Sequence, residues 1–357
     1  MFEPTFIVTS MTNFGRKYDG LYVACVTPYK PNGLEVDEPA LREFLRYFLQ
    51  PKFTQAGGAI IINPEAGEIF VLNKEERIRN VRIAVEECKG KVPVFAGAFG
   101  ITVDEAVQCA KDAKKEGADG IFWLPPQGTM EVTTDWDADK YPDVWIDHMK
   151  EVVKAADLPL IVHAAGGRWL MSGYVGYLGI GGPSPTATRK IVTEVPNIIG
   201  WKMIYQWEAY RMIARMFKSL DRELGRHVGI FGAGTGNFHA ALAEGLFDGT
   251  STGGWNYALE PMLEHILAWR EGNVSKAREI WDSGLFDLHL YVNQDRSHIR
   301  YKIATWLHGL IPNPYMRPPM PKPKKEEILK LKDALTKTKI SVISDAKIRE
   351  VTNQLQD

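Results

Sequence analysis

The chain has 357 residues, of which 45% are hydrophobic, and it carries a formal net charge of -1 at pH 7. That length suits one large domain, and the near-neutral charge argues against binding to nucleic acid or to an anionic membrane. The three cysteines have neither metal-ligand spacing nor the number that a disulfide framework needs. No signal-peptide pattern and no run long enough to span a bilayer is present, so we expect a cytoplasmic protein.

After an N-terminal arm over residues 1–18, eight short apolar runs alternate with amphipathic segments. The apolar runs are 21–28, 58–63, 92–98, 120–124, 158–164, 198–203, 228–232 and 249–253. Helix-like segments between them are 38–49, 74–88, 103–116, 143–155, 186–194, 208–220 and 237–246. Eight such units predict an α/β fold, a (β/α)8 TIM barrel over residues 19–256. A doubly wound sheet is the alternative, but the glycine fingerprint of its first turn is absent here.

Residues 257–357 are predicted to form a C-terminal helical extension. Helical stretches at 257–272 and 276–283, and a long one that ends at residue 308, precede a proline-rich connector at 311–323. A final charged helix begins at Lys324. The extension has more apolar surface than a lone barrel needs, which tends to mark an interface and predicts a homo-oligomer.

Lys202 is the most informative residue. It lies near the carboxyl end of the sixth apolar run, in Asn197-Ile-Ile-Gly-Trp-Lys-Met203. Burial disfavours the charged ammonium and leaves some neutral amine, which can form a Schiff base with a carbonyl substrate. The alternative is a structural lysine whose ammonium reaches solvent or pairs with a carboxylate.

Several motifs occur in a specific order along the chain. They are Gly20-Leu-Tyr-Val-Ala-Cys-Val-Thr-Pro28, Ala66-Gly-Glu68, Leu72-Asn-Lys-Glu-Glu-Arg77, Val94-Phe-Ala-Gly97, Gly117-Ala-Asp-Gly120, the segment around Lys202, and the tail Leu310-Ile-Pro…Arg317-Pro-Pro…Pro321. Together they resemble the dihydrodipicolinate synthase / N-acetylneuraminate lyase superfamily of class I Schiff-base aldolases. The resemblance covers residues 18–340. It implies that Lys202 is the Schiff-base lysine, that no cofactor or metal is required, and that the protein is a homotetramer.

The residues around Lys202 depart from the pattern of that superfamily. Where its members have Gly-Thr-Thr-Gly-Glu, which binds the substrate carboxylate, this chain has Pro64-Glu65-Ala66-Gly67-Glu68. Glu65 would repel a substrate carboxylate unless it is protonated or turned away. His163 stands where the resemblance places the acid/base tyrosine, and an imidazole can do similar work; a satisfied core histidine is the alternative. Gln127 corresponds to the second relay tyrosine and cannot usefully transfer a proton.

Two further features concern substrate binding. Arg168 stands five residues after His163, where the superfamily often has an arginine for a distal carboxylate, although it could instead pair with Glu65 or Glu68. In the segment 172–185, glycines alternate with Tyr174 and Tyr177. That segment is either a lid over the barrel mouth or a surface insertion.

The two last strands end in glycine-rich turns, which contain Gly232 and Gly253. Such turns hold phosphate groups in many barrels, but in the superfamily that this chain resembles the same loop shapes the pocket floor.

Four tryptophans fall at or beside the predicted strand ends: Trp123, Trp169, Trp201 and Trp255. A strand-end residue that points into the barrel mouth lines the pocket, whereas its neighbours pack beneath helices, so we expect about half of them to form a wall. An apolar wall suits a bulky or aromatic substrate better than a polyhydroxylated sugar.

We therefore expect a lyase of the aldolase or hydratase-aldolase type that acts on a 2-oxo acid and a bulky or aromatic aldehyde. Three alternatives remain open. One is a dehydratase or another carbonyl-substrate lyase of the same superfamily, and the second is a catalytically lapsed barrel that binds a ligand. The third is an enzyme that uses Glu65 and His163 as an acid/base pair without a covalent step.

Overall fold

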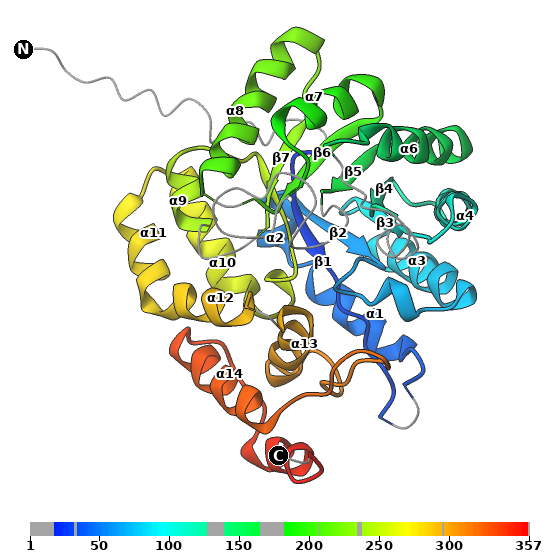
Figure 1. Cartoon of the computed structure of the whole chain (residues 1–357). Helices are drawn as coiled ribbons and strands as arrows, with labels where there is room; N and C mark the ends of the chain where they lie inside the picture. The colour runs from blue at the N-terminus through cyan, green and yellow to red at the C-terminus, as the bar shows by residue number, and fades with distance from the viewer. Residues whose placement is uncertain are drawn as a thin grey trace, which may run out of the picture.

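The computed structural model describes residues 18–31, 34–126, 139–164, 182–205, 207–233, 238–294 and 296–355. Eight parallel strands form a closed barrel in chain order, and β8 pairs with β1 (Figure 1). The strands are β1 (Leu21–Ala24), β2 (Gly58–Ile62), β3 (Val94–Ala98), β4 (Gly120–Trp123), β5 (Leu160–His163), β6 (Ile198–Met203), β7 (Gly229–Gly232) and β8 (Gly249–Thr252). The predicted TIM barrel is confirmed.

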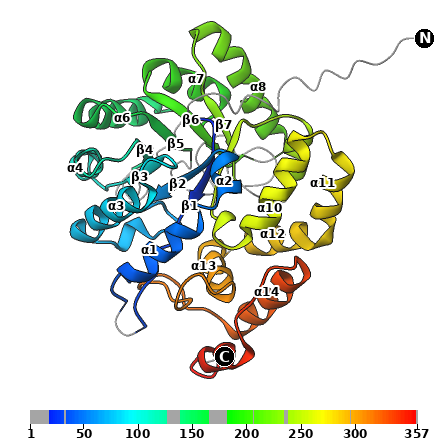
Figure 2. The ribbon, with the colours of Figure 1, turned by 180° about the vertical axis from the view of Figure 1, so that it is seen from behind.

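Helices surround the barrel, as the front and back views both show (Figures 1 and 2). Those that precede β8 are α1 (Glu38–Tyr47), α2 (Pro51–Gln55), the short η1 (Ile69–Val71), α3 (Lys74–Cys88), α4 (Val103–Lys115), α6 (Pro142–Ala156), α7 (Pro185–Glu194), α8 (Trp207–Leu224) and α9 (Phe238–Ala243). Capping boxes at Asn73 and Thr102 fix where α3 and α4 begin. The apolar-polar segregation of helices such as α1 and α8 explains why their positions were predictable from the sequence.

The C-terminal part contains α10 (Trp255–Arg270), α11 (Val274–Ile280), the π-helical turn η2 (Trp281–Leu285), α12 (Phe286–Val292), α13 (Ser297–Leu307), α14 (Lys325–Lys337) and α15 (Asp345–Thr352). The domain boundary expected at residue 256 falls inside α10. The long helix expected to end at residue 308 is divided into α12 and α13. The final charged helix is also two helices, because Ser344 accepts a hydrogen bond from the backbone N–H of Lys347 and starts α15.

Side chains inside the barrel form a core separate from the larger one between strands and helices. The interior core consists of Tyr22, Ala59, Ile61, Phe95, Phe122, Leu124, Ile161 and Phe231. The ring of Tyr22 contacts those of Phe95 and Phe231, with centroid distances of 5.3 and 5.2 Å. This packing fills the interior of the barrel, so that no pore runs through it. A binding site can therefore form only at the ends of the strands.

A bulge in β6 sets the direction of Lys202. Leu160 of β5 pairs with Ile198, but the next residue, Ile161, pairs with Gly200, so Ile199 is an extra residue in β6. Side chains alternate across a strand, and one extra residue reverses that alternation. Lys202 therefore points into the barrel, where its amine lies 5.5 Å from the centroid of the Phe122 ring.

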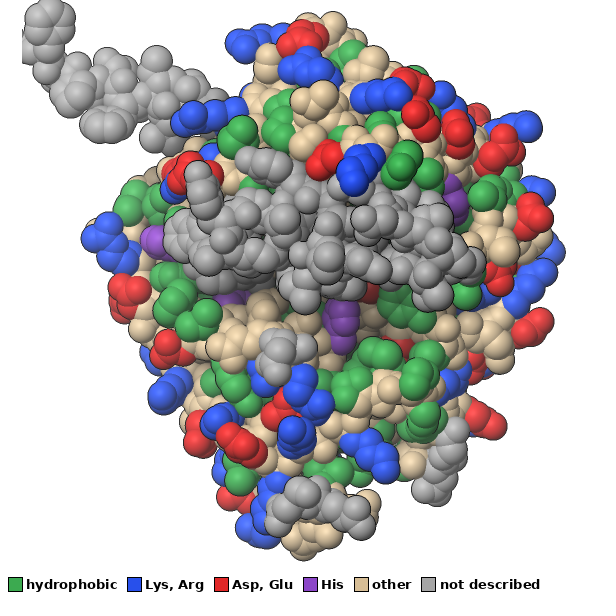
Figure 3. Space-filling view, viewed as in Figure 1, with side chains coloured by type: hydrophobic (Ala, Val, Ile, Leu, Met, Phe, Trp, Pro, Cys, Tyr) green, Lys and Arg blue, Asp and Glu red, His purple; other side chains and the backbone are tan. Residues whose placement is uncertain are grey.

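The distribution of charged side chains on the surface agrees with the near-neutral net charge of the chain. Lys and Arg side chains are interspersed with Asp and Glu around the face shown in Figure 3, without a field of one sign. Within the described ranges, no helix is both long and apolar enough to cross a bilayer.

Candidate active site

Three polar side chains meet at the carboxyl ends of β2, β5 and β6. The Oε1 oxygen of Glu65 accepts a hydrogen bond from Nε2 of His163 at 3.0 Å and also pairs with the amine of Lys202. His163 and Lys202 face each other in the register of β5 and β6. The side chains of Glu65, His163 and Lys202 are only 10%, 6% and 7% exposed. Their charges therefore act on one another with little screening.

Burial and neighbouring groups determine the protonation of Glu65 and His163 at neutral pH. Burial by itself raises the pKa of Glu65, but the charges of Lys202 and His163 bring that pKa well below its ordinary value. Burial, with the nearby charge of Lys202, lowers the pKa of His163, although Glu65 opposes that shift. Glu65 is thus a carboxylate and His163 a neutral imidazole. The second oxygen of Glu65, Oε2, has no hydrogen-bond partner among the described residues.

A tight turn after β2 directs the side chain of Glu65 toward Lys202 and His163. Asn63 and Glu68 have left-handed backbone conformations, with φ of 53° and 62°, and enclose this turn. The side chain of Asn63 donates to the carbonyl of Arg77, and the Thr27 hydroxyl donates to the carbonyl of Gly67 at 2.6 Å. These bonds hold the turn, so Glu65 is not turned away from the site. Its lowered pKa keeps it a carboxylate, and its pairing with Lys202 balances the negative charge that would otherwise repel a substrate carboxylate.

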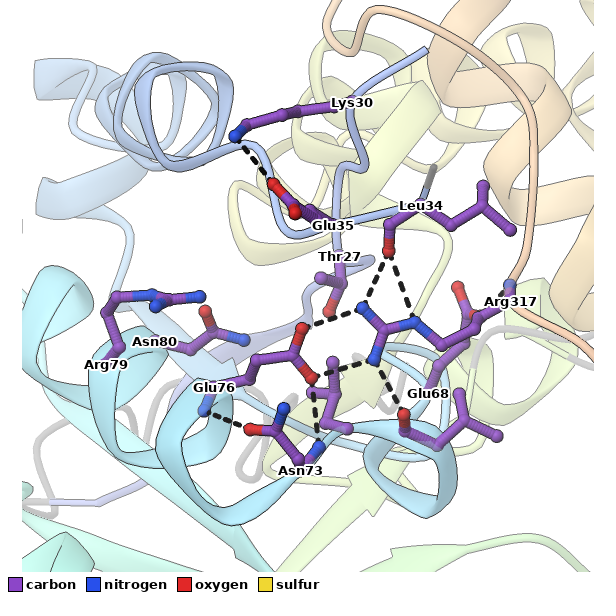
Figure 4. Close-up of polar contacts among 12 residues, drawn as sticks. Thr27, Lys30, Leu34, Glu35, Glu68, Asn73, Glu76, Arg79, Asn80 and Arg317 are labelled. Atoms are coloured by element: carbon purple, nitrogen blue, oxygen red, sulfur yellow. Dashed lines mark hydrogen bonds and ion pairs between the residues drawn. The ribbon is translucent and has the colours of Figure 1, made fainter. Parts of the chain in front are cut away.

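The neighbouring Glu68 has a structural role. It is fully buried, and its carboxylate pairs with the amine of Lys302 and accepts from the backbone N–H of Arg317 at 2.8 Å. Arg317 in turn makes a two-pronged ion pair with Glu76 and donates to the carbonyl of Leu34, as Figure 4 shows. These contacts join the C-terminal connector to the turn that carries Glu65.

Helix α13 contributes two residues that the sequence did not single out. His298 is partly buried, and its charge interacts with those of Glu65, Lys202 and His163. Tyr301, one turn later, is also coupled electrostatically to Glu65. No local pattern marks these residues, because α13 reaches the mouth only through the folding of the extension.

Three predicted wall tryptophans instead pack beneath helices. The ring of Trp123 lies against Trp145 of α6, with a centroid distance of 5.2 Å, and its N–H donates to His148. Trp201 packs against Phe217 of α8 with a centroid distance of 5.7 Å. The assignment of both to the pocket was wrong, because strand alternation directs the interior position to Phe122 and Lys202 instead.

The predicted position of Trp255 in the pocket is also wrong. Its ring packs on Phe53 of α2, with a centroid distance of 5.2 Å, and its N–H donates to the hydroxyl of Thr250 at 2.8 Å. Thr250 itself points outward from β8. The indole of Trp255 is therefore part of the layer between the barrel and its helices.

Of the small residues predicted to bind substrate, two point away from the barrel mouth and one lies beside it. Ala66 is fully buried, and its methyl group belongs to the larger core. A Cβ at Gly232 would face the ring of Phe247, which packs with the helices, so this position also points away from the mouth. A Cβ at Gly253 would lie 2.7 Å from the ring of Tyr301, so this glycine lets α13 approach the mouth.

The remaining predicted site residues lie outside the described residues. They are Gln127, Arg168, Trp169, Tyr174 and Tyr177. Their proposed roles stay predictions.

Comparisons with known proteins agree with the barrel fold. The family model of the dihydrodipicolinate synthetase family matches residues 17–338. The 4-hydroxy-tetrahydrodipicolinate synthase of Campylobacter jejuni is 28% identical over 333 residues, which cover 90% of this chain and 97% of that protein.

Two solved structures share the fold. Dihydrodipicolinate synthase from Aquifex aeolicus has a TM-score of 0.70 at 24% identity, covering 91% of this chain and 99% of that one. A structure described as the first monomeric dihydrodipicolinate synthase variant has a TM-score of 0.71 at 22% identity, covering 90% of this chain and 97% of that one.

The fold and the buried strand-end lysine define a class I, aldolase-type lyase. The chain belongs to the dihydrodipicolinate synthetase family, as a divergent member with low identity to its relatives.

Proposed function

We propose that this enzyme forms a Schiff base between Lys202 and the 2-oxo group of a 2-oxo acid, and that it makes or breaks a bond to a bulky or aromatic aldehyde. The observation that carries the proposal is the setting of the Lys202 amine. It is buried at the carboxyl end of β6 and shares one carboxylate oxygen of Glu65 with His163. A nucleophile next to a proton acceptor that is itself held by a third group is the arrangement that covalent catalysis requires.

Glu65 is placed to take the proton that Lys202 must lose. An ammonium cannot attack a carbonyl, so its proton has to leave before the carbinolamine forms. Once Lys202 is neutral, the charge that lowers the pKa of Glu65 is gone, while the burial that raises it remains. Glu65 therefore holds the proton and returns it to the hydroxyl of the carbinolamine, which leaves as water and yields the iminium.

His163 serves as the second acid/base group. Its neutral imidazole lies beside Glu65 and across from Lys202, and we assign to it the protons on the carbon adjacent to the iminium. Removal of a proton from that carbon gives the enamine that adds to an aldehyde, and return of the proton completes the reverse reaction. General acid/base catalysis of this kind contributes roughly 10²–10⁴-fold in rate.

The proposal of a bulky or aromatic aldehyde is supported by fewer aromatic residues than we expected from the sequence. Three tryptophans face helices, but the ring of Phe122, at the top of the interior core, lies 5.5 Å from the Lys202 amine and 5.7 Å from the His163 ring. Ala66 further lacks the hydroxyl that the superfamily's motif provides. An apolar surface of this kind favours a bulky or aromatic partner.

A second candidate function is supported by the hydrogen bond between Glu65 and His163. A carboxylate–imidazole pair could dehydrate or isomerise a carbonyl substrate by proton transfer alone. In that case Lys202 would provide charge only, and the Lys202→Arg variant would keep measurable activity. The Schiff-base function predicts that Arg is as inactive as Ala, because a guanidinium is not a nucleophile at neutral pH.

The experiment measures aldehyde release from a panel of aromatic and small polar 4-hydroxy-2-oxo acids. Wild type, Lys202→Ala, Lys202→Arg and the control Lys190→Ala are compared; Lys190 is an exposed lysine that pairs with Asp143. We expect wild type and the control to favour aromatic members and both Lys202 variants to be inactive. Activity in Lys202→Arg contradicts the Schiff base, and a tenfold preference for small polar members contradicts the aromatic partner.

We also propose a homotetramer, by similarity to the superfamily. Apolar side chains on the extension support an interface there: Phe286, Leu290 and Leu329 are 38%, 46% and 45% exposed. Isolated exposed apolar residues are common, but a helix that presents two of them four residues apart offers a continuous strip.

A further inference from the structure

Helix α13 is fixed over the barrel mouth by residues on one of its faces. His298, Tyr301 and Lys302 are spaced by three and four residues, so they share that face. Lys302 pairs with Glu68, three residues beyond Glu65 on the turn after β2. The ring of Tyr301 covers Gly253 after β8. The first two turns of α13 are thus held between the loops that follow β2 and β8.

His298 stands at the start of this face. Its ring meets that of Tyr301 edge-on, with a centroid distance of 5.7 Å. It lies close enough to the triad of Glu65, Lys202 and His163 for their charges to act on its pKa, in addition to the larger effect of burial. It is partly exposed, whereas the triad is buried, so it lies on the outer side of the reacting amine.

We propose that His298 is a catalytic acid/base residue that acts on the hydroxyl of a 4-hydroxy-2-oxo acid bound to Lys202. This inference rests on the proposed Schiff-base function. In the cleavage direction, the imidazole of His298 accepts the proton of the C4 hydroxyl, and the O–H electron pair forms the carbonyl of the released aldehyde. The C3–C4 bond breaks, and its electron pair moves through C2 to the iminium nitrogen, which leaves an enamine on Lys202. Condensation follows the same steps in reverse.

The division of labour between the two histidines follows from their positions. His163 is hydrogen-bonded to Glu65 within the strand wall, so it is suited to protons near C3 and to the Schiff base. His298 enters from the extension, where the distal part of a substrate attached to Lys202 would extend. Burial lowers the pKa of His298 to about 4, with Lys202 and His163 contributing and Glu65 opposing, so its imidazole is a free base at neutral pH.

Two readouts separate the steps. Exchange of the methyl protons of pyruvate with deuterium oxide requires the Schiff base and enamine but no hydroxyl, whereas aldehyde release requires both. We expect His298→Gln to lower aldehyde release by roughly 10²–10⁴-fold, the span for a lost acid/base group, and to leave exchange within about threefold of wild type. His308→Gln is the matched control, since His308 ends the same helix and contacts Tyr47 instead of the triad.

The outcomes distinguish this inference from the function on which it rests. Absence of exchange in wild type contradicts the Schiff-base function itself. Normal exchange in wild type, with aldehyde release by His298→Gln within threefold of it, overturns the role of His298. Equal loss of both readouts in a folded His298→Gln also overturns it, because His298 would then act at the Schiff base. If the Gln variant unfolds, His298→Asn provides the same comparison with a smaller side chain.

Discussion

Lys202 and Glu65 lie 137 positions apart in the sequence, yet their side chains form a buried ion pair at the barrel mouth. The pair is what distinguishes this chain from the motif that it resembles, because an acidic residue takes the position of a threonine. In the proposed mechanism, the carboxylate takes up the proton that Lys202 loses, a role that the threonine hydroxyl of the motif could not fill. The consequences for stability and for activity can be measured separately.

The first prediction concerns that pair. Lys202→Ala should abolish turnover and also reduce the free energy of unfolding at pH 7 by about 1–3 kcal/mol, because it leaves a buried carboxylate without its main partner. In wild type, the lowered pKa of Glu65 makes the pair stabilising above the ordinary carboxyl pKa, and this stabilisation is lost as the pH falls through the folded-state pKa. The loss in the variant should therefore shrink at acidic pH.

Glu65→Gln, combined with Lys202→Ala, is the matched test. It removes the unpaired charge, so the double variant should recover most of the lost stability in denaturant titrations but no activity. A double variant that is as unstable as Lys202→Ala would show that Glu65 is not the partner that matters. Turnover by Lys202→Ala within tenfold of wild type would contradict the nucleophile assignment.

The second prediction concerns His163. His163→Phe should lower kcat by roughly 10²–10⁴-fold while still allowing an adduct on Lys202. Because burial and Lys202 lower the pKa of His163, wild-type activity should be retained at neutral pH and fall on the acidic side, below the ordinary histidine value. A pH–rate profile measured for both proteins tests this: an acid limb that persists unchanged in the variant belongs to another group.

The third prediction tests the corrected positions of the tryptophans. Trp201→Phe should reduce the melting temperature, because the indole fills space between β6 and helix α8. It should leave kcat/KM within about twofold. Phe122→Leu should also lower the melting temperature, because its ring belongs to the interior core, but it should in addition affect kcat/KM, and more for aromatic aldehydes than for small ones. A large change of substrate preference in the Trp201 variant would place its ring in the pocket after all.

The fourth prediction concerns assembly. If the strip on α12 is an interface, Phe286→Asp together with Leu290→Asp should lower the molar mass seen by light scattering from that of a tetramer, without loss of helix content. Ile101→Asp, at an exposed site on the barrel that is 57% accessible, is the control for a simple effect of added charge. A wild-type protein that is monomeric across micromolar concentrations refutes the tetramer.

Much of the fold was predictable because it depends on local repetition. Eight apolar runs alternate with seven helical segments, and this rhythm determined the barrel and nearly all strand positions. Lys202, His163 and Glu65 were found for a related reason: each lies at or just after the end of a strand, and parallel strands bring their carboxyl ends together.

The directions of side chains were harder to predict. The extra residue Ile199 changes the alternation in β6, and nothing in the apolar run announces a bulge. Without knowledge of the bulge, the side chain of either Trp201 or Lys202 could be assigned to the interior of the barrel. His298 was missed because its position near Glu65 depends on the path of the C-terminal extension, more than 200 residues further along the chain.

The central claim is that Lys202 is the residue that becomes covalently attached to substrate. The most direct measurement is reduction with borohydride in the presence of pyruvate, followed by mass spectrometry of the peptides from wild type and Lys202→Arg. The account predicts one reduced pyruvyl adduct, on the peptide that contains Lys202, and none in the variant. An unmodified Lys202 peptide, or an equal adduct in the variant on another lysine, would contradict it.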